Sequence, residues 1–131
     1  MLGSVEGLRV VELGAGIGRF TGELARTAKT VLAVDFMEHL IAENQQVNKR
    51  FKNVEWKAAD ATAMQLPAES CDVIFSNWLL MYLDDAEVSK LATDAILWVR
   101  PTQRGLWKEV TRPPYDRNSY QSPPDLSPDD E

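Results

Sequence analysis

The chain has 131 residues, enough for one domain with a hydrophobic core but too few for two. Its formal net charge is −6 and its Lys and Arg residues are scattered, which disfavours a nucleic-acid substrate because phosphate binding depends on clustered cations. We expect a cytoplasmic protein without a membrane span, since no apolar run approaches roughly 20 residues and the single cysteine, Cys71, suits a reducing compartment.

Hydrophobic periodicity predicts strands that alternate with helices along most of the chain. This alternation implies an α/β fold with a parallel sheet covered on both faces and joined by right-handed crossovers. Asp84 and Asp85 can cap the last helix, and Pro101 stops it. The predicted elements are strands over residues 8–13, 31–35, 53–58 and 72–76, and helices over residues 18–29, 37–50 and 86–99.

Each predicted helix has an apolar side that we expect to face the sheet. His39, the only histidine, is expected to face solvent, and one His with one Cys cannot form a zinc site, so no metal is expected. The inward residues are Phe20, Leu24, Ala25 and Ala28 in the first helix, Leu40, Ile41 and Val47 in the second, and Val88, Leu91, Ala92, Ala95, Ile96 and Val99 in the third.

The end of the chain differs in composition from the rest. Residues 102–111 can supply one short fifth strand, which would complete a domain over residues 1–111. Five of the seven prolines fall in the final nineteen residues, and the last three residues are acidic. Because such a segment buries too little apolar surface to offset its ordering entropy, we expect residues 112–131 to be disordered, with a partner-binding tail as the alternative.

The most informative motif lies between the first strand and the first helix, where residues 12–18 read Glu-Leu-Gly-Ala-Gly-Ile-Gly. Asp35 ends the second strand, twenty-one residues beyond Gly14. A glycine turn that allows close backbone approach, followed by a carboxylate for ribose hydroxyls, is the geometry that a nucleoside-bearing cofactor needs. The alternative is that the glycines only form a turn and that Glu12 only ends a strand.

The charge and spacing of the motif favour one class of cofactor. Dinucleotide enzymes typically have G-x-G-x-x-G, whereas the glycines here follow G-x-G-x-G at positions 14, 16 and 18. A carboxylate at Glu12 would repel a pyrophosphate but would suit an ammonium or a sulfonium. S-adenosylmethionine carries both cations, so we expect it as the cofactor, with a nicotinamide-dependent oxidoreductase as a further alternative.

Polar side chains at the other strand ends fit the same ligand, and each also has a purely structural interpretation. Asp35 can accept from both ribose hydroxyls or cap the following helix. Asp60 and Ala61 can bind the adenine edge or form an Asx turn. Arg19 can reach the methionine carboxylate or stay solvated. Phe36 and Met37 can pack on the adenine or in the core. Asn77 comes directly after the fourth strand, where that strand meets the same pocket.

Residues 10–22 resemble motif I of class I S-adenosylmethionine-dependent methyltransferases. Residues 74–83, Ile-Phe-Ser-Asn-Trp-Leu-Leu-Met-Tyr-Leu, resemble more narrowly the first methyltransferase domain of the phosphoethanolamine N-methyltransferases. The resemblance covers roughly residues 5–100. It implies a Rossmann-like sheet that binds S-adenosylmethionine through Gly14, Gly16, Arg19, Asp35, Asp60, Ala61 and Asn77.

The resemblance also implies a reaction, methyl transfer to the amine of phosphoethanolamine on the route to phosphocholine. Tyr82 falls where related enzymes place a catalytic residue near the acceptor, and packing under the next helix is its alternative role. Compared with the family, the chain is expected to lack a lid segment before the first strand and to be truncated after strand four or five. We therefore expect an incomplete or inactive form, open to association through its sheet edge, with a non-catalytic cofactor-binding or partner module as the rival function.

Overall fold

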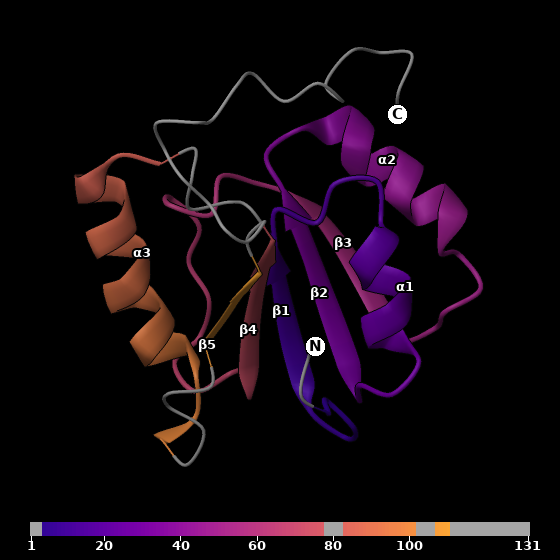
Figure 1. Ribbon diagram of the computed structural model, residues 1–131, viewed down its shortest axis with the longest axis horizontal. Coiled ribbons are helices and arrows are strands. Elements are labelled where there is room, and N and C mark those ends of the chain that lie inside the picture. The colour runs from indigo at the N-terminus through magenta and orange to yellow at the C-terminus, as the bar shows by residue number, and fades with distance from the viewer. Residues whose placement is uncertain (1–3, 78–82, 102–106, 111–131) are drawn as a thin grey trace.

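The computed structural model describes residues 4–77, 83–101 and 107–110, and for residues 77 and 107–110 it describes the backbone alone. Strands and helices alternate along these residues, as predicted, except over residues 59–72, where two strands are joined without a helix (Figure 1). The elements are β1 (Arg9–Leu13), α1 (Arg19–Ala25), β2 (Thr30–Asp35), α2 (Glu38–Val47), β3 (Val54–Ala58), β4 (Val73–Asn77), α3 (Asp85–Trp98) and β5 (Trp107–Val110).

The strands form one sheet in the order β3-β2-β1-β4-β5, and all neighbouring pairs are parallel. This confirms the predicted α/β class and the short fifth strand. Leu13 aligns with Val34 on one side and with Ser76 on the other, so the carboxyl ends of β1, β2 and β4 meet at one rim. The chain leaves β1 toward β2 and later returns to β4 on the opposite side, which makes this rim the switch point where open α/β sheets bind ligands.

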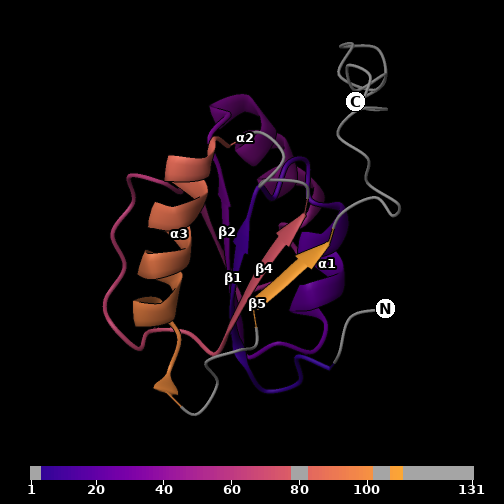
Figure 2. The ribbon, with the colours of Figure 1, turned by 60° about the vertical axis from the view of Figure 1, so that its left-hand side comes forward.

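The helices form a layer on each side of the sheet. α1 and α2 cover one face and α3 covers the other (Figure 2). Successive residues of a strand point to opposite faces of the sheet, so neighbouring residues pack against different helices. In β1, Val11 and Leu13 pack in the cluster under α3, whereas Val10 packs in the cluster under α1.

The first two helices are shorter than predicted. α1 ends at Ala25 rather than at residue 29, because the Asn53 side-chain amide donates to the carbonyls of Ala25 (2.9 Å) and Ala28 (3.1 Å) and so caps the end of the helix. α2 ends at Val47, and the prediction that Val47 faces the core is wrong, since its side chain is 55% exposed. Asn44 takes the buried position on this face instead.

The third helix begins at Asp85, one residue before its predicted start, and its buried face differs from the prediction. Asp84 is the N-cap. Its carboxylate accepts from the Glu87 amide at 2.7 Å, and the Glu87 carboxylate accepts from the Asp84 amide at 3.1 Å. Leu91, Ala95 and Trp98 form the buried row, spaced by four and three residues. The prediction that Ala92 and Ile96 face inward is wrong, because each lies one residue, about 100° of rotation, beyond this row and is exposed.

A buried carboxylate joins the amino ends of the strands to the end of α3. The Asp72 side chain is 4% exposed, accepts from the Arg9 amide at 2.8 Å and pairs with the guanidinium groups of Arg9 and Arg100. Burial alone would raise the pKa of Asp72, but this hydrogen bond and the two cations outweigh it and lower the pKa.

Asp72→Asn should therefore destabilise the fold. The substitution removes the charge while keeping the shape. We expect a loss of about 1–3 kcal/mol in the free energy of unfolding, the usual value for a hydrogen bond to a charged group, because water can hydrate Arg9 and Arg100 once the carboxylate is gone. Urea unfolding at pH 7 measures this loss. The difference from the wild type should shrink in acid, as Asp72 protonates below its usual range. A difference that grows in acid would contradict the assignment.

Two predictions fall on residues that the structure does not describe, Tyr82 and the tail over residues 112–131. The domain boundary at residue 111 therefore stays a prediction. No helix in the described part of the chain is long and apolar enough to cross a membrane.

Candidate functional site

The glycine turn follows β1 at the carboxyl rim of the sheet. Gly14, Gly16 and Gly18 have φ values of +71°, +56° and +102°, a region that side chains strain to adopt. The Ala15 amide donates to the Val34 carbonyl at 2.9 Å, so the turn is held against the end of β2. The turn thus bends sharply at the rim before α1 begins at Arg19, and its residues Gly14, Gly16 and Ile17 are half-buried.

Asp35 lies at the end of β2 and contacts this turn directly. One carboxylate oxygen accepts from the Gly16 amide at 2.9 Å, and the other accepts from the Met37 amide at 2.8 Å. The second contact lies just before α2, whose N-cap is Met37 and has no side-chain cap, so the interpretation of Asp35 as the cap of that helix is wrong. Each oxygen has two acceptor sites, so both can still accept from ribose hydroxyls. Asp35 therefore unites the turn, the second strand and the start of α2.

Gly16 borders open space. A Cβ atom built there would meet no heavy atom within 4 Å. A ligand that approaches the turn backbone would occupy this space.

Gly16→Ala should separate binding from stability. The methyl group costs about 1 kcal/mol of backbone strain at this positive φ, yet it occupies the space that a nucleoside needs. We expect little change in thermal stability and at least a tenfold loss in affinity for S-adenosylhomocysteine, measured by calorimetric titration. Gly7→Ala is the matched control, since Gly7 also has positive φ (+71°) and no neighbour within 4 Å. Equal affinities of the two variants would remove Gly16 from the site.

Asp60 and Ala61 follow β3 beside Asp35. The Ala59 amide donates to the Asp35 carbonyl at 2.9 Å, which brings this loop to the same rim. One Asp60 carboxylate oxygen accepts from the Thr62 hydroxyl (2.6 Å) and the Thr62 amide (2.8 Å), and these bonds lower the pKa of Asp60. This is the Asx turn of the structural interpretation. Asp60 is nonetheless exposed, so its other oxygen remains accessible to a ligand.

Two large apolar side chains stand in solvent next to this rim. Phe36 is 72% exposed and Met37 is 43% exposed, so the interpretation that they belong to the core is wrong. Arg19 is exposed at the start of α1. Asn77 ends β4 one residue beyond the pairing of Ser76 with Leu13, beside the glycine turn. The structure therefore brings the candidate residues to one rim, Tyr82 excepted, which lies outside the described residues.

Glu12 does not present a charge to the rim. It is 1% exposed, and the Thr21 hydroxyl of α1 donates to its carboxylate. Burial raises the pKa of Glu12 to about 8; the Thr21 bond opposes this shift and the charge of Asp35 adds to it. Glu12 is therefore largely protonated at neutral pH and does not present the carboxylate charge that was expected to suit a cationic ligand.

The structure also contains a buried polar network behind the turn, which the sequence pattern did not predict. Its members are Thr21, Asn44, Asn48 and Trp56, and it contacts the carbonyls of Gly16 and Gly18. A signal was present, because Ile41, Asn44 and Asn48 follow the spacing of one helix face. Asparagine on an otherwise apolar stripe indicates a buried amide with fixed partners.

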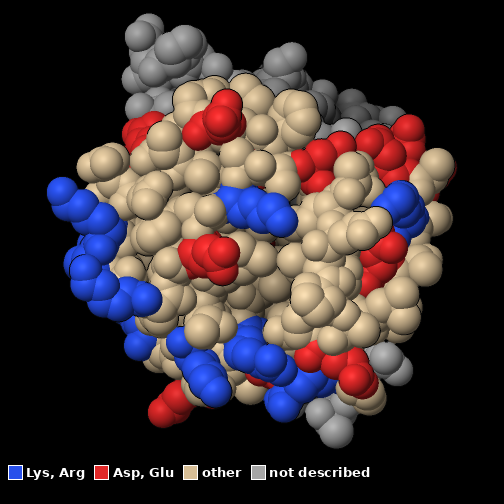
Figure 3. Space-filling model, turned by 180° about the vertical axis from the view of Figure 1, so that it is seen from behind, with Lys and Arg blue, Asp and Glu red and all other residues tan. Residues whose placement is uncertain are grey.

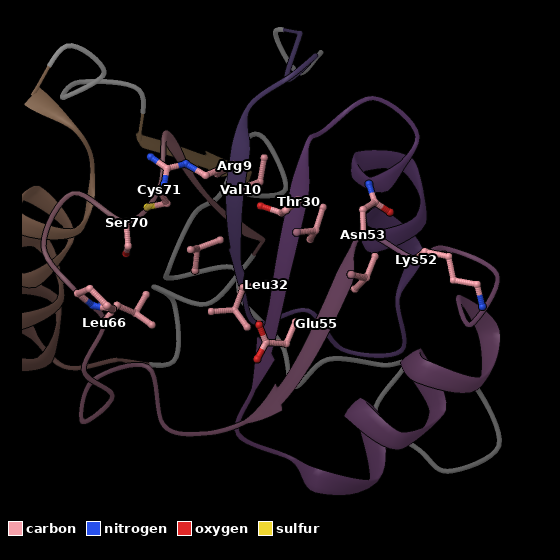
Figure 4. Close-up of a pocket in the computed structure, with 14 residues that line it drawn as sticks. Arg9, Val10, Thr30, Leu32, Lys52, Asn53, Glu55, Leu66, Ser70 and Cys71 are labelled. Carbon is pink, nitrogen blue, oxygen red and sulfur yellow. The ribbon is translucent and has the colours of Figure 1, made fainter.

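A separate groove lies away from this rim. It has a volume of ≈ 420 Å³ and is lined by the amino-terminal halves of β1, β2 and β3 and by the linker before β4 (Figure 4). Leu32 and Glu55 project into it from the sheet, opposite Leu66. The linker over residues 59–72 contains turns but no helix, which leaves this part of the sheet uncovered.

The electrostatics of this groove also differ from those of the rim. Lys and Arg gather along the lower edge of this face, where the amino ends of the strands lie, and acidic side chains gather near the start of α3 (Figure 3). Arg9 and Lys52 line the groove itself. Ligands of parallel α/β sheets bind at the carboxyl ends of the strands. The groove is therefore not the candidate site.

Comparisons with known proteins agree with this fold. The family described as "Methyltransferase domain" matches residues 10–102. A phosphoethanolamine N-methyltransferase of Triticum aestivum is 55% identical over 102 residues, which are 76% of this chain and 20% of that protein. Phosphoethanolamine N-methyltransferase 3 of Arabidopsis thaliana is 53% identical over 98 residues, 73% of this chain and 20% of that one. The chain thus spans about a fifth of the length of these curated relatives.

Solved structures agree with these sequence relatives. Phosphoethanolamine N-methyltransferase 1 of Haemonchus contortus, solved with phosphoethanolamine and S-adenosylhomocysteine, superposes with a TM-score of 0.74 at 43% identity, covering 76% of this chain and 21% of that one. An S-adenosylmethionine-dependent methyltransferase of Mesorhizobium loti superposes with a TM-score of 0.70 at 30% identity, covering 76% and 45%. The Rossmann-like sheet is shared with both.

Proposed function

Because the chain belongs to the methyltransferase domain family, we propose that it binds S-adenosylmethionine at the carboxyl rim and directs methyl transfer to the amine of phosphoethanolamine. The cofactor residues of this proposal are Gly14, Gly16, Arg19, Asp35, Asp60, Ala61 and Asn77.

The hydrogen bond from the Gly16 amide to Asp35 is the observation that carries this proposal. It joins a turn whose backbone is open to a ligand with a carboxylate that can accept from ribose hydroxyls. Phe36, exposed one residue later, offers an aromatic face to the adenine. A nucleoside thus finds a donor surface, an acceptor pair and an apolar contact on consecutive parts of one rim.

When bound, the cofactor supplies a methyl group on a positively charged sulfur. The chain contributes orientation: amides at the turn and Arg19 for the methionine carboxylate, and Asp35 for the ribose. The acceptor amine must lose a proton before it attacks the methyl carbon in line with the departing sulfur. Tyr82 is the proposed residue for orienting or deprotonating that amine, and Tyr82→Phe should lower turnover by about a hundredfold if it does so.

A labelled-methyl assay tests this function directly. The protein is incubated with S-adenosylmethionine carrying a labelled methyl group and with phosphoethanolamine, and the label should appear in the methylated base. Cofactor binding without product would favour the second candidate, a non-catalytic cofactor-binding module. Absence of cofactor binding would contradict both.

The remaining expectations belong to the same proposal. A small phosphobase rather than a nucleic acid suits the net charge of −6, and a cytoplasmic location suits the single cysteine. Among the described residues β5 pairs only with β4, so association of two chains through this edge stays a prediction, which sedimentation equilibrium can check.

A further inference from the structure

The inner side of α2 carries two buried asparagines. Asn44 is 0% exposed and Asn48 is 2% exposed, and they lie one helical turn apart on the same face. Burying a primary amide costs free energy unless its donors and acceptors are satisfied. Where the two amides find their partners therefore indicates what they hold in place.

Asn44 makes all four hydrogen bonds that a primary amide can make. Its nitrogen donates to the Gly16 carbonyl (3.2 Å) and the Thr21 hydroxyl (2.9 Å). Its oxygen accepts from the Asn48 amide (3.0 Å) and the Trp56 indole (2.9 Å). A carbonyl can only accept and an indole N–H can only donate, so these partners fix the orientation of the Asn44 amide.

Asn48 extends this network to the end of the glycine turn. Its nitrogen donates to the Gly18 carbonyl at 3.1 Å as well as to Asn44. In a trans peptide the carbonyl of one residue and the N–H of the next point in opposite directions. Holding the carbonyls of Gly16 and Gly18 toward α2 therefore directs the amides of Ile17 and Arg19 away from α2.

We propose that Asn44 and Asn48 are positioning residues for the cofactor site, which hold the glycine turn through two of its carbonyls. This inference rests on the proposed function, because it assigns the orientation of the turn to ligand binding. It explains why the side of α2 that packs Ile41 in a cluster with Ala15 of the turn also buries Asn44, with Asn48 one helical turn further on. Without these bonds the turn samples other peptide orientations. The apparent affinity then falls in proportion to the fraction of molecules whose turn keeps the orientation that binds the ligand.

Calorimetric titration with S-adenosylhomocysteine, using the full chain, tests the proposal. We expect Asn48→Ala to raise the Kd at least tenfold while remaining folded by circular dichroism. Asn48→Asp, which keeps the volume but loses both donors, is the second variant and should weaken binding similarly. Val31→Ala is the control: Val31 is buried near the amino end of β2, away from the rim, so its truncation lowers stability without touching the turn, and the Kd should stay within twofold.

A second readout distinguishes positioning from packing. The indole N–H of Trp56, assigned by its loss in Trp56→Phe, should shift in ¹H–¹⁵N spectra when the wild type is saturated with S-adenosylhomocysteine, because ligand and indole share the Asn44 network. Folded Asn48 variants with wild-type affinity, or an unmoved Trp56 signal in the liganded protein, would overturn the inference and leave the proposed function intact. A wild type that binds no S-adenosylhomocysteine would overturn both.

Discussion

Gly18→Ala is expected to lower the free energy of unfolding by about 2–6 kcal/mol and to abolish cofactor binding. Two penalties add at this residue. A side chain at φ +102° strains the backbone by about 1–3 kcal/mol. The new Cβ would also lie 2.3 Å from the Asn48 side-chain nitrogen and 2.6 Å from the Asn44 side-chain oxygen, and overpacking of this kind costs about 1–3 kcal/mol.

Gly7→Ala again provides the matched control for Gly18→Ala. Gly7 has φ +71° but no atom within 4 Å of its Cβ position, so the variant has the backbone strain without the overpacking. Urea unfolding of both variants measures the difference, which should be about 1–3 kcal/mol. If the two variants lost the same stability, the asparagines would not be packed against Gly18 as the structure shows.

Glu12→Gln is expected to remove a large pH dependence of stability. The pKa of Glu12 is raised from 4.5 in the unfolded chain to about 8 in the fold. Between these values the unfolded state has lost a proton that the native state keeps, so the stability that Glu12 contributes is fully present below pH 4.5 and is lost as the pH rises through about 8. At about 1.4 kcal/mol per pKa unit, the full effect is of the order of several kcal/mol.

The glutamine retains the shape and the acceptor for Thr21 but does not titrate. The stability of Glu12→Gln relative to the wild type should therefore increase steadily from pH 5 to pH 8.5, as measured by urea unfolding at each pH. Every other titrating group is common to the two proteins, so the difference isolates Glu12. A difference that stays constant across this range would show that Glu12 is ionised in the fold.

The strand pattern and the turn were predictable because they depend on local signals. Apolar runs identified β1 and β2, and the glycine spacing placed the turn between β1 and α1 at the rim. Parallel pairing then required Asp35 to end near that turn, and the structure bonds it to Gly16. Asp84 could be predicted as a cap because a capping box is written in four consecutive residues.

The errors arose where tertiary partners decide the outcome. Asn44 and Asn48 are polar, so periodicity assigned them to no layer, yet their partners lie on the turn and on β3. Glu12 was read as a charge because the sequence does not reveal that Thr21 and the layer of α1 enclose it. Ile96 was placed inward because it is apolar, although the buried row of α3 follows Leu91, Ala95 and Trp98.

Amide spectra of the wild type during titration with S-adenosylhomocysteine test the central claim most directly. A nucleoside lodged at the carboxyl rim should shift the ¹H–¹⁵N signals of the glycine turn, of Asp35 and Phe36, and of the Asp60 loop, while signals of the groove residues Leu32 and Glu55 stay in place. Shifts confined to the groove, or unchanged turn signals at saturating ligand, would contradict the account.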